Sequence, residues 1–173
     1  MAKPSKLPNA KKWRVAIDST VLIAGFGWPR WSHEVLLHAL KQDYRLILSD
    51  NVIEHAERWF EKNLPAASVL FRDFLNAVGY ELAPTPSEDE VAEQITLIRH
   101  ANDVPVALAY IKAKVDYFVT DDKDFTDEDA TTAEVRKHLK IMRPVIFLRE
   151  VMGWSKEDLE KVRFRNWPLE EGT

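Results

Sequence analysis

The chain has 173 residues, with 46% hydrophobic and 30% charged side chains, a composition typical of one globular domain of ordinary size. It contains no cysteine, which excludes disulfides and thiolate metal sites and fits a reducing compartment. The formal net charge of −4 does not by itself indicate a nucleic-acid-binding protein. No apolar run approaches the roughly 20 residues that span a bilayer, and residues 1–12 lack the apolar centre of a secretion signal. We therefore expect a cytoplasmic protein without a membrane segment.

Positive charge is concentrated at the N-terminus. Residues 1–14 contain no acid and five basic side chains, which are Lys3, Lys6, Lys11, Lys12 and Arg14. Such an arm either contacts phosphates or is a solvated, partly disordered tail. We expect a basic, flexible arm over residues 1–12.

The first half of the chain alternates short apolar runs with stretches of helical periodicity. Strands are predicted over residues 14–18, 44–48 and 80–83. Helices are predicted over residues 31–41, from a Ser49 or Asp50 cap to about 62, and from Pro65 onward. The breaker-rich run Gly25-Phe-Gly-Trp-Pro29 predicts a loop.

The second half continues the alternation. Ser87 and Glu90 form a capping box that predicts a helix to about His100, and Asn102 is predicted to cap the next helix. A fourth strand is predicted over residues 117–120 and a fifth over 142–147, at an edge because of Pro144. Short helices follow at 148–152 and from Ser155. This order predicts an α/β fold with a mostly parallel sheet covered on both faces.

Acidic residues fall where the predicted strands end. Asp18 ends the first strand, Asp122 and Asp124 follow the fourth, and Asp103 stands in the first turn of the helix before it. Ligands bind beyond the carboxyl ends of strands in open α/β sheets. Carboxylates about 4–6 Å apart repel one another and raise each other's pKa, and a divalent cation removes that repulsion. Taken singly, each acid is also an ordinary turn, first-turn or loop residue.

Three segments carry a resemblance to a known family. Ile17-Asp-Ser-Thr-Val-Leu-Ile23 resembles the opening motif of PIN domains, Asn102-Asp-Val-Pro-Val-Ala-Leu-Ala109 their third-acid motif, and Thr120-Asp-Asp-Lys-Asp-Phe125 their fourth motif. The order and spacing match across about residues 13 to 150. The resemblance implies a three-layer α/β/α sandwich with a central, mostly parallel sheet of about five strands. It places a PIN-like domain at residues 13–153, followed by a C-terminal helix and tail at 154–173.

The resemblance also implies an activity, that of a divalent-metal-dependent endoribonuclease using Mg²⁺ or Mn²⁺. Asp18, Asp103, Asp122 and Asp124 match the family's acids as metal ligands, the first three also as catalytic residues, and Ser19 and Thr120 match small hydroxyl positions that orient carboxylates. Many family members are toxins of toxin–antitoxin pairs. RNA is therefore the expected substrate, and an antitoxin protein and a second copy of the chain are candidate partners.

The sequence departs from the family at the second acid. The family has Glu six residues beyond a Ser or Pro on the helix after the second strand, and counting from Ser49 reaches His55. The apolar stripe of that helix places Glu54 nearly opposite its buried face, whereas His55 flanks the stripe. Either a local register shift brings Glu54 in as a fifth metal ligand, or His55 takes the place as a ligand that suits Mn²⁺ or Zn²⁺ better than Mg²⁺.

Other functions compete with this hypothesis. Because position 55 lacks a carboxylate, the chain is alternatively a degenerate PIN domain that binds RNA or a partner without cleavage. A phosphohydrolase using Asp18 as nucleophile ranks third, since that chemistry usually wants a second Asp where Thr20 stands. Trp28 and Trp31 flank the predicted loop and either stack on bases or pack the loop.

Overall fold

Five short parallel strands form one sheet in the computed structural model, which describes residues 12–169. The strands are β1 (Arg14–Ile17), β2 (Arg45–Leu48), β3 (Glu81–Leu82), β4 (Tyr117–Val119) and β5 (Ile141–Met142). Their order is β3-β2-β1-β4-β5, and each neighbouring pair is parallel. The chain runs outward from β1 to β3 and then returns to place β4 on the other side of β1. The point where the strand order reverses therefore lies between β1 and β4, which is where open α/β sheets bind ligands.

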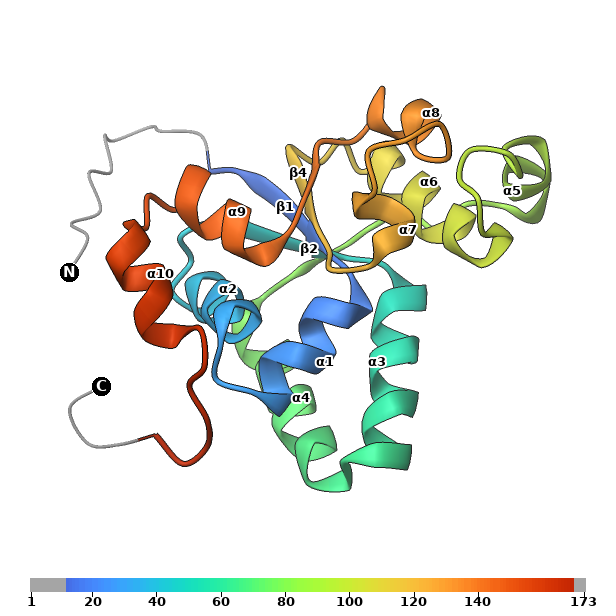
Figure 1. Ribbon diagram of the computed structural model, residues 1–173. Coiled ribbons are helices and arrows are strands. Elements are labelled where there is room, and N and C mark those ends of the chain that lie inside the picture. The colour runs from blue at the N-terminus through green and yellow to red at the C-terminus, as the bar shows by residue number, and fades with distance from the viewer. Residues whose placement is uncertain (1–11, 170–173) are drawn as a thin grey trace.

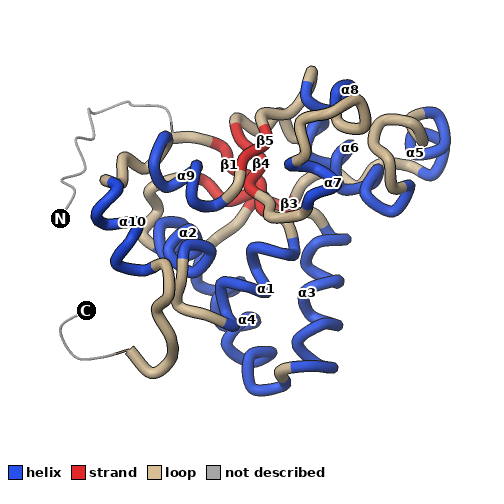
Figure 2. The backbone as a smooth tube through the Cα atoms, in the orientation of Figure 1, coloured by secondary structure: helices blue, strands red, loops and turns tan. Residues whose placement is uncertain are grey.

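Helices cover both faces of this sheet, which gives the expected three-layer α/β/α sandwich (Figures 1 and 2). The α-helices in the described residues are α1 (Ser19–Gly27), α2 (Trp31–Leu40), α3 (Asp50–Asn63), α4 (Pro65–Val78), α5 (Glu88–Glu93), α6 (Val104–Lys112), α7 (Lys123–Thr126), α8 (Ala133–Arg136), α9 (Pro144–Glu150) and α10 (Lys156–Val162). A 3₁₀ turn, Ala101–Asp103, precedes α6. Figure 1 shows α1–α4, α9 and α10 on one side of the sheet and α5–α8 on the other. Within residues 12–169, no helix has the length and apolar content needed to cross a membrane.

The central strands are apolar on both faces because helices cover both. Val15, Ala16 and Ile17 of β1 are fully buried, as are Phe118 and Val119 of β4. Continuous apolar runs of this kind are typical of parallel strands that are buried on both sides. Each large side chain buried in this way contributes roughly 1.5–3 kcal/mol to the stability of the fold.

Tyr110 of α6 holds the carboxyl ends of β1 and β2 together. Its buried hydroxyl donates a hydrogen bond to the Ile17 carbonyl oxygen at 2.7 Å and accepts one from the Ser49 N–H at 3.3 Å. A buried polar group left without a partner costs about 1–3 kcal/mol, so both contacts fix α6 relative to the sheet. The helix α6, which Asp103 directly precedes, is thereby anchored to Ile17, the residue before Asp18.

The capping signals at three helices are confirmed. The Ser49 side chain accepts from the Val52 N–H at the start of α3, and Ser155 caps α10 in the same way. Ser87 and Glu90 form the predicted capping box at α5. These caps satisfy donors within three residues of the capping side chain, which is why the sequence alone identifies them.

One predicted loop is part of a helix. Residues 25–27 are the last residues of α1, although their breaker-rich composition predicts a loop. Gly25 is buried there, and a Cβ on it would lie 2.4 Å from Leu36 Cδ1 of α2. The glycine therefore allows α1 and α2 to approach closely, which outweighs its low helix propensity.

The predicted fifth strand is also wrong beyond its first residue. β5 ends at Met142, and Pro144 is the first residue of α9, where a missing N–H leaves no hydrogen bond unmade. Phe147 and Leu148 are buried, and α9 packs on α2. β5 nevertheless lies at a sheet edge, as expected.

The segment before α6 differs from its prediction as well. α5 ends at Glu93 instead of near His100, because the chain turns to bury the consecutive residues Leu97 and Ile98. Asn102 lies inside the 3₁₀ turn, and Asp103 is the residue that flanks α6. The predicted basic arm lies outside the described residues, apart from Lys12.

Candidate metal centre at the carboxyl edge of the sheet

Asp18 follows β1 directly and is the buried member of the acidic group. Only 6% of the residue is exposed, and its Oδ1 accepts the Ser19 N–H at 2.8 Å, which caps α1. Its Oδ2 accepts hydrogen bonds from the hydroxyls of Thr120 at 2.8 Å and Thr20 at 3.3 Å. Burial raises the pKa of this carboxyl, and the Thr120 and Ser19 hydrogen bonds act against that rise. The side chain is therefore fixed in position by contacts to both of its oxygens.

Thr120 links the ends of β1 and β4. It is fully buried, and its hydroxyl accepts the Asp122 N–H at 3.0 Å while donating to Asp18. The predicted role of Thr120 as a residue that orients a carboxylate agrees with this geometry. Asp122 in turn caps α7, with its Oδ1 accepting the Asp124 N–H at 2.9 Å. Hydrogen bonds thus run without a break from Asp18 to Asp124.

Three half-buried carboxylates gather beside this network. One oxygen each from Asp103, Asp122 and Asp124 lies within 4.8 Å of the others. Asp103 comes from the residue before α6, and the other two come from the segment after β4. From the parallel arrangement of the strands, the sequence predicted a shared edge for Asp18, Asp122 and Asp124. The position of α6 beside β4, where Tyr110 contacts Phe118, brings Asp103 to the same edge.

Burial and neighbouring negative charge both raise the pKa of Asp103. Burial raises the pKa of its carboxyl to about 6, and the negative charges of Asp122, Asp18 and Asp124 add to that rise. Asp18 therefore acts on the group electrostatically, although it lies outside the set of oxygens within 4.8 Å. Carboxylate oxygens are the ligands that Mg²⁺, Mn²⁺ and Ca²⁺ prefer. The acidic triad of Asp103, Asp122 and Asp124 thus has the donor chemistry to bind a divalent metal ion, which would also relieve the repulsion.

Two basic side chains contact Asp124. Arg99 Nη2 lies 2.5 Å from Asp124 Oδ1, and His100 Nε2 lies 3.3 Å from the same oxygen. Both residues precede the 3₁₀ turn and are about half exposed. A cation bound through Asp124 would use its other oxygen or displace Arg99. The sequence alone does not indicate these contacts, because Arg99 is 25 positions away from the carboxylate that it contacts.

The two candidates on α3 point to different surroundings. His55 Nδ1 lies 3.0 Å from Ser19 Oγ, so position 55 faces the first turn of α1 and hence the edge that holds Asp18. Glu54 is exposed and makes no hydrogen bond or ion pair with any residue in the range 12–169. It also lies outside the carboxylate group of Asp103, Asp122 and Asp124. These positions agree with the helical geometry, which placed His55 beside the buried stripe.

Comparisons with known proteins support the fold but indicate no function. No family model matches the sequence, and no curated protein matches it. Nine chains of solved structures match. Among them is the crystal structure of PAE2754 from Pyrobaculum aerophilum, with a TM-score of 0.51 and 17% identity over 72% of this chain and 91% of that one. The likeness supports the α/β/α architecture described above.

Proposed function

We propose that this chain is a PIN-like endoribonuclease that binds Mg²⁺ or Mn²⁺ at the carboxyl edge of its sheet and hydrolyses phosphodiester bonds in RNA. The main support is that Asp103, Asp122 and Asp124 come together from two separate segments. They meet at the point where the strand order reverses, next to the buried Asp18. Like charges brought this close destabilise the metal-free protein, so the arrangement suits a cation. The fold and the three sequence motifs agree with this reading.

Each acidic residue has a distinct part in the proposal. Asp103, Asp122 and Asp124 supply hard oxygen ligands, and a bound divalent ion would activate water and stabilise the charge that develops on the phosphate. Asp18 contributes buried negative charge from a position fixed by Thr120 and Thr20. Thr120 is a positioning residue, since it holds both the Asp18 carboxylate and the Asp122 backbone.

A second candidate, binding of RNA without cleavage, is favoured by two contacts. Asp124 is already paired with Arg99, and residue 55, which faces the site, is a histidine that bonds to Ser19. A group with three carboxylates and an internal cation holds a divalent ion less tightly than four free carboxylates would. In this case the edge binds RNA but does not hydrolyse it.

The decisive experiment is incubation of the pure protein with labelled single-stranded RNA in Mn²⁺, in Mg²⁺ and in EDTA. We would run Asp122→Asn beside it, with Asp73→Asn as the matched control, because Asp73 is an exposed acid on α4 without a hydrogen bond or ion pair to residues 12–169. Cleavage is expected with metal, at a rate lowered more than about 100-fold by Asp122→Asn and unchanged by Asp73→Asn.

Two results would contradict the proposal. Cleavage that persists in EDTA would remove the role of a metal. A folded protein that binds RNA and cuts none of it in either metal would make the binding-only candidate the better description.

A further inference from the structure

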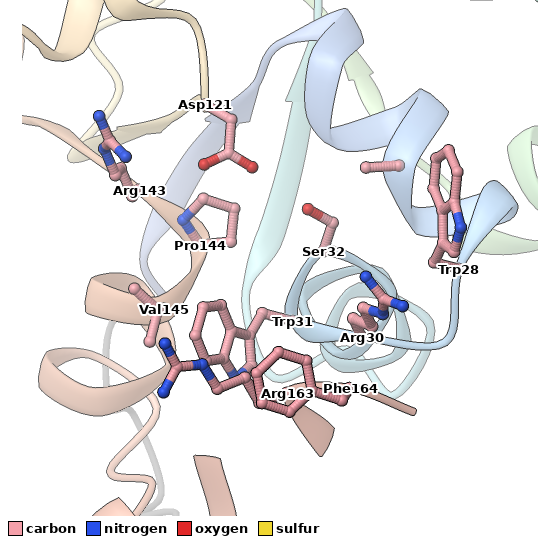
Figure 3. A pocket seen from close by; sticks show the side chains of 11 residues that line it. Trp28, Arg30, Trp31, Ser32, Asp121, Arg143, Pro144, Val145, Arg163 and Phe164 are labelled. Carbon is pink, nitrogen blue, oxygen red and sulfur yellow. The ribbon is translucent and has the colours of Figure 1, made fainter. Parts of the chain in front are cut away.

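A separate pocket adjoins the acidic edge. It has a volume of about 410 Å³, within the range of small-molecule sites. The segment between α1 and α2 forms one wall, and the start of α9 with the segment after α10 forms the other (Figure 3). Three aromatic and three arginine side chains dominate its lining, namely Trp28, Trp31, Phe164, Arg30, Arg143 and Arg163.

The pocket is built by the residues that follow α10. Arg165 Nε donates to the Pro29 carbonyl oxygen at 2.6 Å, and its Nη2 pairs with Glu34 at 2.6 Å in largely buried surroundings. Arg30 Nε donates in return to the Arg165 carbonyl oxygen at 3.1 Å. The indole N–H of Trp31 donates to the Leu159 carbonyl oxygen at 2.9 Å. These contacts hold the C-terminal wall against α2, so the pocket does not need to form when a ligand arrives.

Two exposed aromatic side chains line the pocket. Phe164 is 72% exposed, the highest value among the large apolar side chains of residues 12–169, and Trp28 is 47% exposed. The Arg163 guanidinium carbon lies 5.1 Å from the centre of the Phe164 ring. Large apolar side chains at such exposure on either side of one pocket are typical of a binding surface. Rings and guanidinium groups placed together are the elements with which proteins stack single-stranded bases and contact phosphates.

The pocket is joined to the acidic centre through Asp121, which points into it in Figure 3. The Asp121 N–H donates to Thr20 Oγ1 at 3.3 Å, and the Thr20 hydroxyl bonds to Asp18. Asp122, the next residue, belongs to the acidic triad. A polymer bound across the metal centre would therefore reach the pocket within a short length.

We propose that this pocket binds a base and its adjoining phosphate in single-stranded RNA, and so holds a nucleotide next to the one that is cut. The inference rests on the proposed function for the reason to expect RNA. Charge complementarity supports a polyanion, because three arginines line the pocket against one aspartate in a chain whose net charge is −4. Arg163 also pairs with the half-exposed Glu160 at 3.4 Å, so a phosphate would compete with that carboxylate for the guanidinium group. A nucleic acid uses both features, since each repeat carries a phosphate for the guanidinium groups and a flat ring for the aromatic faces, whereas an acidic peptide uses only the first.

Binding is tested in EDTA, so that cleavage plays no part. Fluorescence anisotropy would follow a labelled, unstructured oligoribonucleotide with wild-type protein and with Trp28→Ala, Phe164→Ala and Arg163→Ala. One matched control is Trp13→Ala, whose tryptophan is similarly exposed (43%) but lies where the strands begin, directly before β1. The other is Arg149→Ala, whose arginine is exposed on α9. Thermal unfolding checks that every variant is folded.

Loss of one stacking ring is expected to weaken binding by about tenfold or more. Arg163→Ala is expected to lower the slope of log affinity against log salt by about 0.7, the value for one phosphate contact on a single strand. Both control variants should bind like the wild type. Equal affinities in wild type, Trp28→Ala and Phe164→Ala would overturn the proposal.

Two further comparisons separate the alternatives. If polyglutamate competes as well as RNA, and the same variants weaken both, the pocket recognises charge alone and the nucleotide assignment is wrong.

Cleavage assays on the same variants separate this inference from the nuclease proposal. A raised KM with unchanged kcat supports both, whereas wild-type kinetics in every variant overturns the pocket and leaves the nuclease standing. RNA binding that depends on the pocket, with no cleavage in any metal, supports the pocket and overturns the nuclease proposal.

Discussion

The two edges of the sheet treat charge in opposite ways. At the amino edge, where the strands begin, acids and bases alternate and pair. At the carboxyl edge, where the strands end, four aspartates gather, and within residues 12–169 the ion pairs of this group are those of Asp124 with Arg99 and His100. Both edges belong to the same five strands, so the difference lies in the side chains that the chain places there and not in the backbone.

Glu81 is the centre of the amino edge. Arg14 binds both of its oxygens, at 2.7 and 3.2 Å, and Arg45 Nε donates to it at 2.8 Å. Those hydrogen bonds, the one from Arg14 first, lower the pKa of the Glu81 carboxyl to about 2. The three residues open β1, β2 and β3, so their pairing connects three neighbouring strands. This edge is stabilised by its charges.

At the carboxyl edge, burial first and the neighbouring negative charges second disfavour the ionised form of Asp103. Asp103 has a pKa of about 6 there, as against about 2 for Glu81. Glu81 shows that this fold pairs a carboxylate with arginines where the pairing stabilises the strands, so the close carboxylates of Asp103 and Asp122 at the other edge need another explanation. A ligand of positive charge is the one we propose. Three experiments test this difference between the two edges.

The largest effect is expected for metal binding by Asp103→Asn. Removing one of three close carboxylates should weaken Mn²⁺ binding by about 100-fold or more, since loss of a residue that only supports a ligand already costs about 10- to 100-fold. Isothermal titration calorimetry measures it, with Asp73→Asn on α4 as control. Equal affinities in wild type and Asp103→Asn would show that the acidic edge does not hold its cation through Asp103.

An intermediate effect is expected at the other edge for Glu81→Gln. The change removes charged hydrogen bonds to Arg14 and Arg45 that are partly exposed, so the free energy of unfolding should fall by about 1–2 kcal/mol at pH 7. Urea denaturation measures the fall, and RNA cleavage should remain at the wild-type rate. The difference from wild type should vanish as the pH falls from about 4.5 towards 2, because Glu81 is then protonated in the folded protein as well. A loss of cleavage in a stable Glu81→Gln protein would break the division between a structural and a functional edge.

The smallest effect is expected for pH-dependent stability without metal. Asp103 binds its proton more tightly in the folded protein, with a pKa of about 6, than in an unfolded chain, where the ordinary value is 3.8. Its unfavourable contribution is therefore complete above pH 6 and absent below about pH 4. In EDTA, Asp103→Asn should be more stable than the wild type at pH 7 and equal to it at pH 4, a gain kept modest by solvent screening. A variant less stable than the wild type at pH 7 would contradict the repulsion, and saturating Mn²⁺ should remove the advantage.

Local signals in the sequence were sufficient for much of the fold. The alternation of apolar runs and helical periodicity predicted the parallel α/β sheet, and Ser49, Ser87 and Ser155 marked the starts of α3, α5 and α10. Capping bonds and side-chain periodicity act over a few residues, so they can be read without the tertiary structure. The shared edge of Asp18 and Asp122 also followed, since parallel strands end on one side.

Contacts between distant residues decided the rest. Gly25 is helical because Leu36 packs against it, and Pro144 begins a helix because α9 packs on α2. The pairing of Arg99 with Asp124 joins residues 25 apart, and the bond from Arg165 to Pro29 joins residues 136 apart. The sequence by itself thus determined most of the elements and the edge at which the acids gather. Only the tertiary structure decided which bases reach those acids and which walls enclose the neighbouring pocket, because such contacts depend on how whole elements pack and not on the residues next to them in the chain.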